Sequence, residues 1–411
     1  MVNMNLTRYL EEHIKEICFD SSKMAFVSGP RQCGKTTMAK DMLKLRKWGG
    51  YHNWDELKFR KQWTKDPSQV VLKPRDGKIP LIILDEIHKA KSWKRNLKGL
   101  FDTLEDHCDI IVTGSSRLNV YRKTGDSLMG RYYHFRLHPF SLAELNSSTC
   151  SLPDSLVDAI FNRDIKIKKT HEETLKLLEK FGPFPEPFLS SSPKKLNLWQ
   201  SGRIEKIVRE DLRDLTRLPE LSQVEMLISL LPEKVGSLFS VQSLREDLEV
   251  AHTTVTRWLN YLKELYYFFE VKPYSKSLSN TLKKEGKIYL WDWSEVEEKS
   301  HRFENLVAGH LQKYCHAMTD TGEDRLTLRY VRNKQKKEID FLILKKNKPW
   351  LPVEVKLNDY TLSTSWATFI KHLPCNRGIQ VVRKPNIFKI EKIHDKEILI
   401  ISANEFLAYL I

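Results

Sequence analysis

The chain has 411 residues, of which 41% are hydrophobic and 29% are charged, and this balance argues against a disordered or membrane-embedded protein. The chain is too long for one ordinary hydrophobic core, so two or three domains are expected. Its formal net charge of +15 at pH 7 favours a polyanionic partner such as DNA, and a basic surface that only maintains solubility is the alternative.

The cysteines and the apolar runs indicate where the protein resides. The six cysteines are scattered without a C-x-x-C pair, so zinc binding is not expected. Cys33 lies within a glycine-rich loop in which a disulfide would fix the backbone, and a reducing cytoplasm is the simplest interpretation. No apolar run approaches the roughly 18–20 residues that span a bilayer. Acidic residues within positions 1–20 argue against a signal peptide. We therefore expect a cytoplasmic protein without membrane contact.

The first 148 residues alternate between helical patterns and short apolar runs. Residues 1–20 have the spacing of an amphipathic helix. Buried strands are expected at Met24–Ser28, Leu81–Leu84 and Ile110–Thr113. Strands that alternate with helices predict an α/β domain whose parallel sheet is covered on both faces.

A glycine-rich loop directly follows the first of these strands. It fits G-x-x-x-x-G-K-[ST] and precedes an expected helix at Thr37–Leu45. Its glycines allow backbone N–H groups to face a phosphate, and the helix N-terminus adds partial positive charge. Lys35 would reach the β- and γ-phosphates of ATP, and the Thr36 hydroxyl would bind Mg²⁺. The residues expected to contact the nucleotide are Gly29, Pro30, Arg31, Gln32, Cys33, Gly34, Lys35, Thr36 and Thr37.

Two acidic residues follow the strand Leu81–Leu84. Asp85 is expected to hold the hydration shell of Mg²⁺, and Glu86 to polarise the water that attacks ATP. Two adjacent carboxylates exceed what Mg²⁺ binding requires, so the sequence predicts hydrolysis in addition to binding.

Further candidates for the nucleotide site follow the third strand. The hydroxyls of Thr113 and Ser115 are candidates for sensing the γ-phosphate, because this strand is expected beside the one that ends in Asp85. Arg131 is a candidate arginine finger that acts on a neighbouring subunit of a homo-oligomer, and a surface salt bridge is the alternative. Its rivals for this role are Arg117, Arg122 and Arg136.

The middle of the chain is predicted to be helical. In residues 149–198, prolines in Gly182–Pro187 predict an irregular elbow between domains. Within residues 199–284, Val241–Leu248 and Thr253–Tyr266 have the pattern of a helix-turn-helix. Polar residues of the second helix could contact DNA, and a winged helix that only packs against the ATPase core is the alternative. These residues are Thr253, Thr254, Thr256, Arg257 and Asn260.

Together these motifs resemble those of prokaryotic AAA-type ATPases that carry a C-terminal DUF4143 domain. The resemblance rests on Gly29–Thr37, Leu84–His88, Thr113–Ser116, Gly130–Arg131, Pro139–Ser141, Gly182–Pro187 and Arg209–Leu215. It implies an AAA-like P-loop ATPase domain in residues 1–148, a winged-helix domain in residues 199–284 and a restriction-endonuclease-like α/β domain in residues 285–411.

The last domain contains a second constellation of charged residues. Asp340 lies on one expected strand, and Glu354 and Lys356 lie on the next, in the order of a PD-(D/E)xK phosphodiesterase. The carboxylates would hold Mg²⁺ or Mn²⁺, and the lysine would orient or deprotonate the attacking water. Glu304 is expected to complete the metal shell, with Gln380 as an auxiliary residue. In the alternative, Glu354 and Lys356 form an outward-facing ion pair, because both lie on the same face of the strand.

The sequence therefore predicts an ATPase that acts on DNA and carries a metal-dependent nuclease-like domain. A role in defence against foreign DNA would fit by analogy of architecture. The alternative is a nucleotide-dependent switch or scaffold that binds DNA or a protein partner through a catalytically inactive nuclease-like domain.

Overall fold

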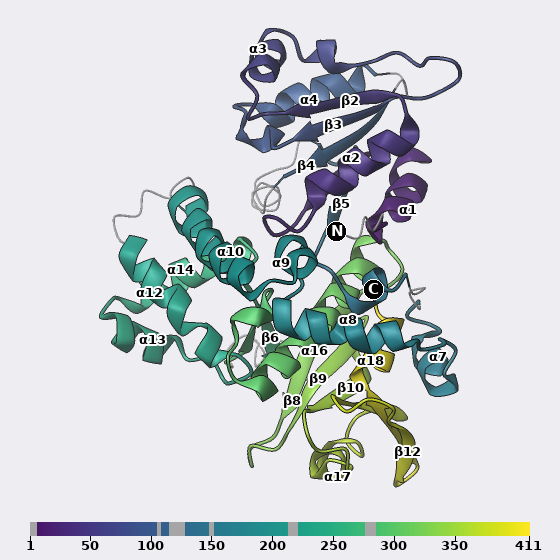
Figure 1. Ribbon diagram of the computed structural model, residues 1–411, viewed down its shortest axis with the longest axis vertical. Helices are drawn as coiled ribbons and strands as arrows, with labels where there is room; N and C mark the ends of the chain where they lie inside the picture. Colours follow the sequence, from purple (N-terminus) through teal and green to yellow (C-terminus); the bar gives the residue numbers. More distant parts are fainter. Residues whose placement is uncertain (1–5, 105–107, 115–127, 148–151, 213–220, 276–284) are drawn as a thin grey trace. The chain divides into compact units, whose positions relative to one another are not determined.

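The computed structural model describes residues 6–104, 108–114, 128–147, 152–212, 221–275 and 285–411 (Figure 1). The chain folds into two compact units, Met1–Pro139 and Phe140–Ile411. Strands and helices alternate in the first unit, whereas helices precede most of the strands in the second. The predicted mixed α/β class is confirmed.

The first unit contains a five-stranded parallel sheet with the strand order β2-β3-β4-β1-β5. The strands are β1 (Met24–Ser28), β2 (Gly49–Asn53), β3 (Leu81–Asp85), β4 (Asp109–Thr113) and β5 (Tyr132–Arg136). Both β1 and β3 are buried along their whole length, which explains their continuous apolar sequences. The three expected strands are confirmed, and β3 pairs with β4 as predicted. Because all five strands are parallel, their carboxyl ends meet at one edge.

Four α-helices accompany this sheet in the described part of the first unit. They are α1 (Leu10–Ile14), which continues as a π-helix to Phe19, α2 (Lys35–Arg46), α3 (Leu57–Lys65) and α4 (Trp93–Asp102). A core of fully buried side chains joins α3 and α4 to the sheet, including Trp63, Ile82 and Leu97. The first helix is shorter than the expected residues 1–20, of which residues 1–5 lie outside the described part.

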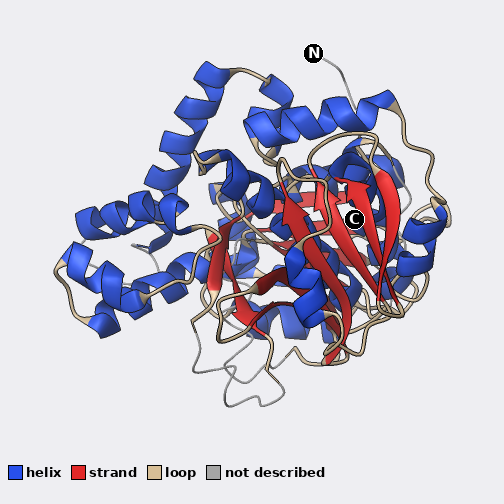
Figure 2. Ribbon diagram, turned by 90° about the horizontal axis from the view of Figure 1, so that it is seen from below, coloured by secondary structure: helices blue, strands red, loops and turns tan. Residues whose placement is uncertain are grey.

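The second unit is built around an eight-stranded mixed sheet (Figure 2) with the order β12-β13-β11-β10-β9-β8-β6-β7. Its strands are β6 (Phe268–Pro273), β7 (Lys287–Leu290), β8 (Leu326–Arg332), β9 (Glu338–Lys345), β10 (Lys348–Lys356), β11 (Arg377–Val382), β12 (Phe388–Ile393) and β13 (Lys396–Ser402). The 22-residue helix α16 (Lys299–Asp320) packs against β7, β8 and β10. The shorter α17 (Thr364–Phe369) buries Trp366 and Phe369 against Ile339 and Leu342 of β9.

The other helices of the second unit are mostly short. They are α6 (Leu142–Leu145), α7 (Leu156–Asn162), α8 (Lys169–Phe181), α9 (Pro185–Ser190), α10 (Pro193–Lys206), which continues as a π-helix (Ile207–Leu212), α12 (Leu221–Leu230), α13 (Val241–Leu248), α14 (His252–Glu264) and α18 (Ala403–Phe406). None of the helices in the described ranges is long and apolar enough to cross a membrane.

The expected irregular elbow at Gly182–Pro187 is wrong in its second half. Pro185 occupies the first turn of α9, where the missing N–H of proline would have no helical partner in any case. Phe184 is fully buried, and the Phe140 N–H donates to the Pro183 carbonyl. This segment is therefore a packed part of the second unit.

The expected helix-turn-helix pair is present as α13 and α14, with Glu249 between them at a φ of +53°. The hairpin of β6 and β7 follows it, and β6 also pairs with β8. The hairpin is therefore continuous with the C-terminal sheet. The domain boundary expected at residue 284 lies between β6 and β7 and stays a prediction.

Candidate functional site

The glycine-rich loop connects β1 to α2 at the carboxyl edge of the first sheet. Gly29 adopts a φ of +150°, and a Cβ added there would lie 2.1 Å from the Leu137 carbonyl oxygen, so no side chain fits. Gly34 adopts a φ of +99° and lets α2 begin directly at Lys35. The Lys35 Nζ donates to the carbonyls of Gly29, at 3.0 Å, and Pro30, at 2.6 Å. The ammonium thus lies within the curve of the loop, where it suits an incoming phosphate.

Asp85 connects three neighbouring elements at the same edge of the sheet. Its carboxylate accepts hydrogen bonds from the hydroxyls of Thr36 at 2.9 Å, Tyr51 at 2.8 Å and Thr113 at 2.5 Å. The side chain is 4% exposed. A threonine hydroxyl and a carboxylate in direct contact at the start of α2 are a donor set that suits Mg²⁺ bound to a nucleotide. Thr36 and Asp85 are therefore the residues that could hold this ion.

Tyr51 is the member of this group that sequence reasoning missed. It lies on β2, whose polar and glycine-rich sequence does not resemble a buried strand. Burial raises the pKa of Tyr51, and the neighbouring Asp85 raises it further, so the phenol stays protonated and donates. The Lys40 Nζ lies 4.0 Å from the ring centroid. Only the pairing of β2 with β3 brings Tyr51 to Asp85, and that pairing could not be read from local sequence.

Glu86 follows β3 in a left-handed conformation, with a φ of +56°. Burial raises the pKa of its carboxyl, whereas Lys89 and Lys35 oppose this shift. Its carboxylate lies 3.4 Å from His88 Nε2 and 3.7 Å from Lys89 Nζ. Other non-glycine residues of the chain adopt this conformation at turns, so it fixes the position of Glu86 without assigning it a role. Its predicted role in polarising water stays a prediction.

Arg131 and Arg136, two candidates for the arginine finger, lie at opposite edges of the first sheet. The Arg131 carbonyl accepts from the N–H of Met24, the first residue of β1, so Arg131 lies at the sheet edge opposite the phosphate loop. Its guanidinium pairs with Asp102 at 2.5 Å. Arg131 therefore does not reach the nucleotide site of its own chain, and only the predicted action on a neighbouring subunit stays open. Arg136, in contrast, ends β5 beside Ser28 at the phosphate-loop edge. Ser115, Arg117 and Arg122 lie outside the described residues.

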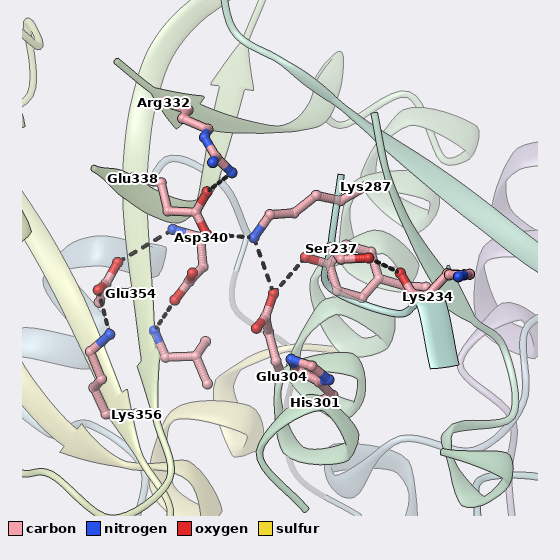
Figure 3. Close-up of polar contacts among 12 residues, drawn as sticks. Lys234, Ser237, Lys287, His301, Glu304, Arg332, Glu338, Asp340, Glu354 and Lys356 are labelled. Atoms are coloured by element: carbon pink, nitrogen blue, oxygen red, sulfur yellow. Dashed lines mark hydrogen bonds and ion pairs between the residues drawn. The ribbon is translucent and has the colours of Figure 1, made fainter. Parts of the chain in front are cut away.

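The C-terminal constellation is assembled on β9 and β10 (Figure 3). The Asp340 carboxylate accepts from the Val355 N–H at 2.8 Å, and the Asp340 N–H donates to Glu354 at 3.3 Å. Glu354 pairs with Lys356 at 2.8 Å. Glu354 and Lys356 thus form the ion pair that the alternative predicts. Glu354 is only 2% exposed, however, so the pair does not face outward. The two strands place both carboxylates and the lysine beside each other.

Burial is the main electrostatic feature of these residues. It raises the pKa of Asp340 to about 7, with Glu304 adding to the shift. It likewise raises the pKa of Glu354 to about 7, with Asp340 adding to it. Burial alone would lower the pKa of Lys356, but Glu354 and Asp340 outweigh this and the pKa is raised. Carboxyls held at such pKa values are typical of functional sites.

Glu304, predicted to complete the metal shell, and Gln380, the predicted auxiliary residue, both make contacts within the fold. Glu304, on α16, accepts from the Tyr289 hydroxyl at 2.7 Å and lies 3.5 Å from the Lys287 Nζ. The Gln380 side chain bonds Trp366, Ser363 and the Thr361 carbonyl, contacts that hold α17 against the sheet. In the ranges that the structure describes, no group of three or more His, Cys, Asp or Glu residues is arranged to hold a metal ion. The metal roles of Glu304, Asp340 and Glu354 stay predictions.

Comparison with protein families confirms the predicted combination of an AAA domain with a DUF4143 domain. Residues 21–146 match an AAA domain, and residues 299–403 match the domain of unknown function DUF4143. Residues 172–295 match a further domain of unknown function, DUF8612, which the sequence reasoning did not anticipate. The first unit, with its parallel sheet and phosphate loop, therefore contains an AAA domain with a P-loop.

Individual relatives are distant. An uncharacterized protein of Haemophilus influenzae is 22% identical over 352 residues, which cover 79% of this chain and 80% of that protein. An uncharacterized protein of Methanocaldococcus jannaschii is 27% identical over 293 residues, covering 66% of this chain and 60% of that protein. Among solved structures, the Walker-type ATPase of Pyrococcus abyssi is 14% identical with a TM-score of 0.42, covering 72% of this chain and 97% of that one.

Proposed function

We propose that the first unit hydrolyses ATP and that the second unit acts on DNA through a PD-(D/E)xK nuclease-like domain. The observation that carries the first part is the contact of Thr36 with Asp85 beside the Lys35 ammonium. Backbone N–H groups of the loop would bind the phosphates, and Lys35 would contact their oxygens. Mg²⁺, when bound, neutralises charge on the phosphates and would be held by Thr36 and Asp85. Glu86 would accept a proton from the attacking water as the bond to the γ-phosphorus forms and the bond from that phosphorus to the bridging oxygen of ADP breaks.

The DNA part of the proposal rests on the second unit. A water oriented by the Lys356 ammonium would attack a phosphodiester and lose a proton to solvent, while the bond from phosphorus to the leaving oxygen breaks and that oxygen takes up a proton. Asp340 and Glu354 would hold a divalent cation, Mg²⁺ or Mn²⁺, which supplies charge neutralisation and activates the water. The hairpin between β8 and β9 exposes Lys334, Lys336 and Lys337 and would contact phosphates. We also place DNA contacts on α14, where His252, Thr253, Thr256, Arg257 and Asn260 line a shallow hollow.

Each part of the chain has a proposed role. We assign residues 1–148 to the ATPase, 149–198 to a helical connection, 199–284 to a winged helix and 285–411 to the nuclease-like domain. Arg131 is the candidate for contacting the nucleotide of a second copy in a homo-oligomer. A reducing cytoplasmic location agrees with the free cysteines Cys18, Cys33, Cys108, Cys315 and Cys375.

A second function is favoured by one specific contact. The buried ammonium of Lys287 lies near the candidate metal site and pairs with Glu304 and Glu338. A lysine held at this place occupies a position that a metal ion could otherwise take, which suits a domain that binds DNA, or a protein partner, without cleaving it. In that case ATP binding and hydrolysis would switch the binding on or off.

Cleavage assays separate these functions. Supercoiled, linear and single-stranded DNA would be incubated with the full chain, ATP and either Mg²⁺ or Mn²⁺. The nuclease proposal predicts cleavage that Asp340→Asn abolishes, whereas the matched exposed control Asp395→Asn retains it. If no DNA form is cut while ATP hydrolysis and DNA binding are intact, the nuclease proposal is wrong and the switch is supported.

A further inference from the structure

Lys287 is a buried lysine that the proposed chemistry does not use. It begins β7, and its side chain is 2% exposed. Its Nζ lies 2.9 Å from Glu338 Oε1 and 3.5 Å from Glu304 Oε1, and Figure 3 shows it directed between the two carboxylates. A buried lysine is tolerated only when carboxylates neutralise it. Lys287 therefore occupies a cation position built into the fold.

One oxygen of the Glu304 carboxylate, Oε1, is already engaged by groups of the protein. Its Oε1 already accepts from the Tyr289 hydroxyl at 2.7 Å and faces the Lys287 ammonium. On another side lies the Gly236 backbone, where an added Cβ would come within 3.3 Å of Oε1 and 3.4 Å of Oε2. Oε1 of Glu304, whose side chain is 17% exposed, is thus engaged by a phenol and an ammonium that both come from β7, with the Gly236 backbone close by.

Three of the four carboxylates around the C-terminal site are in ion pairs among the described residues, and the fourth is not. Glu304 and Glu338 are paired with Lys287 and Arg332, the latter at 3.2 Å from Glu338. Glu354 is paired with Lys356. In the part of the chain that the structure describes, no ion pair involves Asp340. When all these groups are ionised, four carboxylates face three cations and leave one negative charge, carried by Asp340. Such a site suits one divalent cation but not two. The groups counted are Lys287, Glu304, Arg332, Glu338, Asp340, Glu354 and Lys356.

We propose that Lys287 takes the place of a second metal ion, so that the C-terminal site binds one divalent cation, at Asp340 and Glu354, and Glu304 is not a ligand. This inference rests on the proposed nuclease-like function and refines it. Glu304, which the sequence places among the metal ligands, would then not bind the ion. Lys287 would be the residue that sets the number of bound ions.

Mn²⁺ binding to the full chain tests this inference without any activity measurement. Free Mn²⁺ would be counted by electron paramagnetic resonance in the absence of ATP, and binding that survives Asp340→Asn would be subtracted as binding elsewhere. We expect one Asp340-dependent ion per chain in the wild type. Glu304→Gln, which keeps an acceptor for Tyr289, should bind it with unchanged affinity. Lys287→Met should gain a second ion that Glu304→Gln removes again, and the exposed control Lys371→Met should match the wild type.

Two Asp340-dependent ions in the wild type, or a tenfold or larger loss of affinity in Glu304→Gln, would overturn the inference. Should Lys287→Met not fold, Glu304→Gln still decides it. The outcome also separates this inference from the proposed function. One bound ion without DNA cleavage refutes the nuclease and supports the single-ion site. No Asp340-dependent ion in the wild type, Lys287→Met or Glu304→Gln refutes both.

Discussion

Thr113→Val is the substitution that most sharply distinguishes a role through Asp85 from a role in contacting the nucleotide. Thr113 is fully buried, and its hydroxyl donates to Asp85 at 2.5 Å. Valine preserves the shape of the side chain and removes only this donor, while the Thr113 carbonyl still accepts from the Glu86 N–H. A hydrogen bond to a charged group contributes about 1.5–3 kcal/mol, so the free energy of unfolding of the first unit should fall by about that amount.

Urea unfolding measures this change, provided that the transition of the first unit is identified by its shift when ATP is added. Thr113→Ser is the matched control, because it keeps the hydroxyl and loses only a methyl group. ATP hydrolysis should fall in Thr113→Val because one oxygen of Asp85 is no longer held in place. Unchanged stability together with reduced hydrolysis would refute this reasoning. That result would show that Thr113 acts on the nucleotide, as the prediction of a γ-phosphate sensor requires.

Three further substitutions test other contacts. Tyr51→Phe removes the phenol that donates to Asp85, and we expect hydrolysis to require a several-fold higher Mg²⁺ concentration, whereas the exposed Tyr133→Phe should behave as the wild type. Burial raises the pKa of Glu354 from 4.5 to about 7, so the folded chain holds this proton more tightly than the unfolded chain. Its contribution to stability is full below about pH 4.5 and is lost as the pH rises to about 7, and Glu354→Gln should flatten this part of the pH profile of unfolding. Replacing Lys334, Lys336 and Lys337 with Gln should weaken DNA binding and reduce the slope of log affinity against log salt by about 0.9 for each lost phosphate contact.

The phosphate-loop edge of the first sheet could be predicted well from the sequence because its signals are local. The loop motif, the apolar strand before it and the helix after it are contiguous, and Glu86 directly follows Asp85, the last residue of β3. The strands β2 and β5 were missed because β2 contains two glycines and β5 has no apolar run, since Phe135 is its one fully buried residue. Tyr51 was missed with them, since its contact with Asp85 depends on strand order.

In the C-terminal site, too, the contacts between residues far apart in the sequence could not be predicted. The order of Asp340, Glu354 and Lys356 predicted two neighbouring strands, and β9 and β10 do pair. Lys287 could not be foreseen, because β7 lies at the end of an eight-stranded order in which β8 and β6 separate it from β9. A lysine that approaches from so distant a strand leaves no spacing pattern in the sequence. Its partners Glu304 and Glu338 come from α16 and from the start of β9.

Steady-state release of phosphate from ATP by the full chain, measured for the wild type and for Lys35→Ala with and without DNA, tests the central claim most directly. We predict hydrolysis by the wild type that DNA stimulates and that high salt returns to the unstimulated rate. Lys35→Ala should show almost none, because the ammonium within the phosphate loop is lost. Equal rates for the two proteins, or no hydrolysis by the wild type with Mg²⁺ under any condition, would contradict the account.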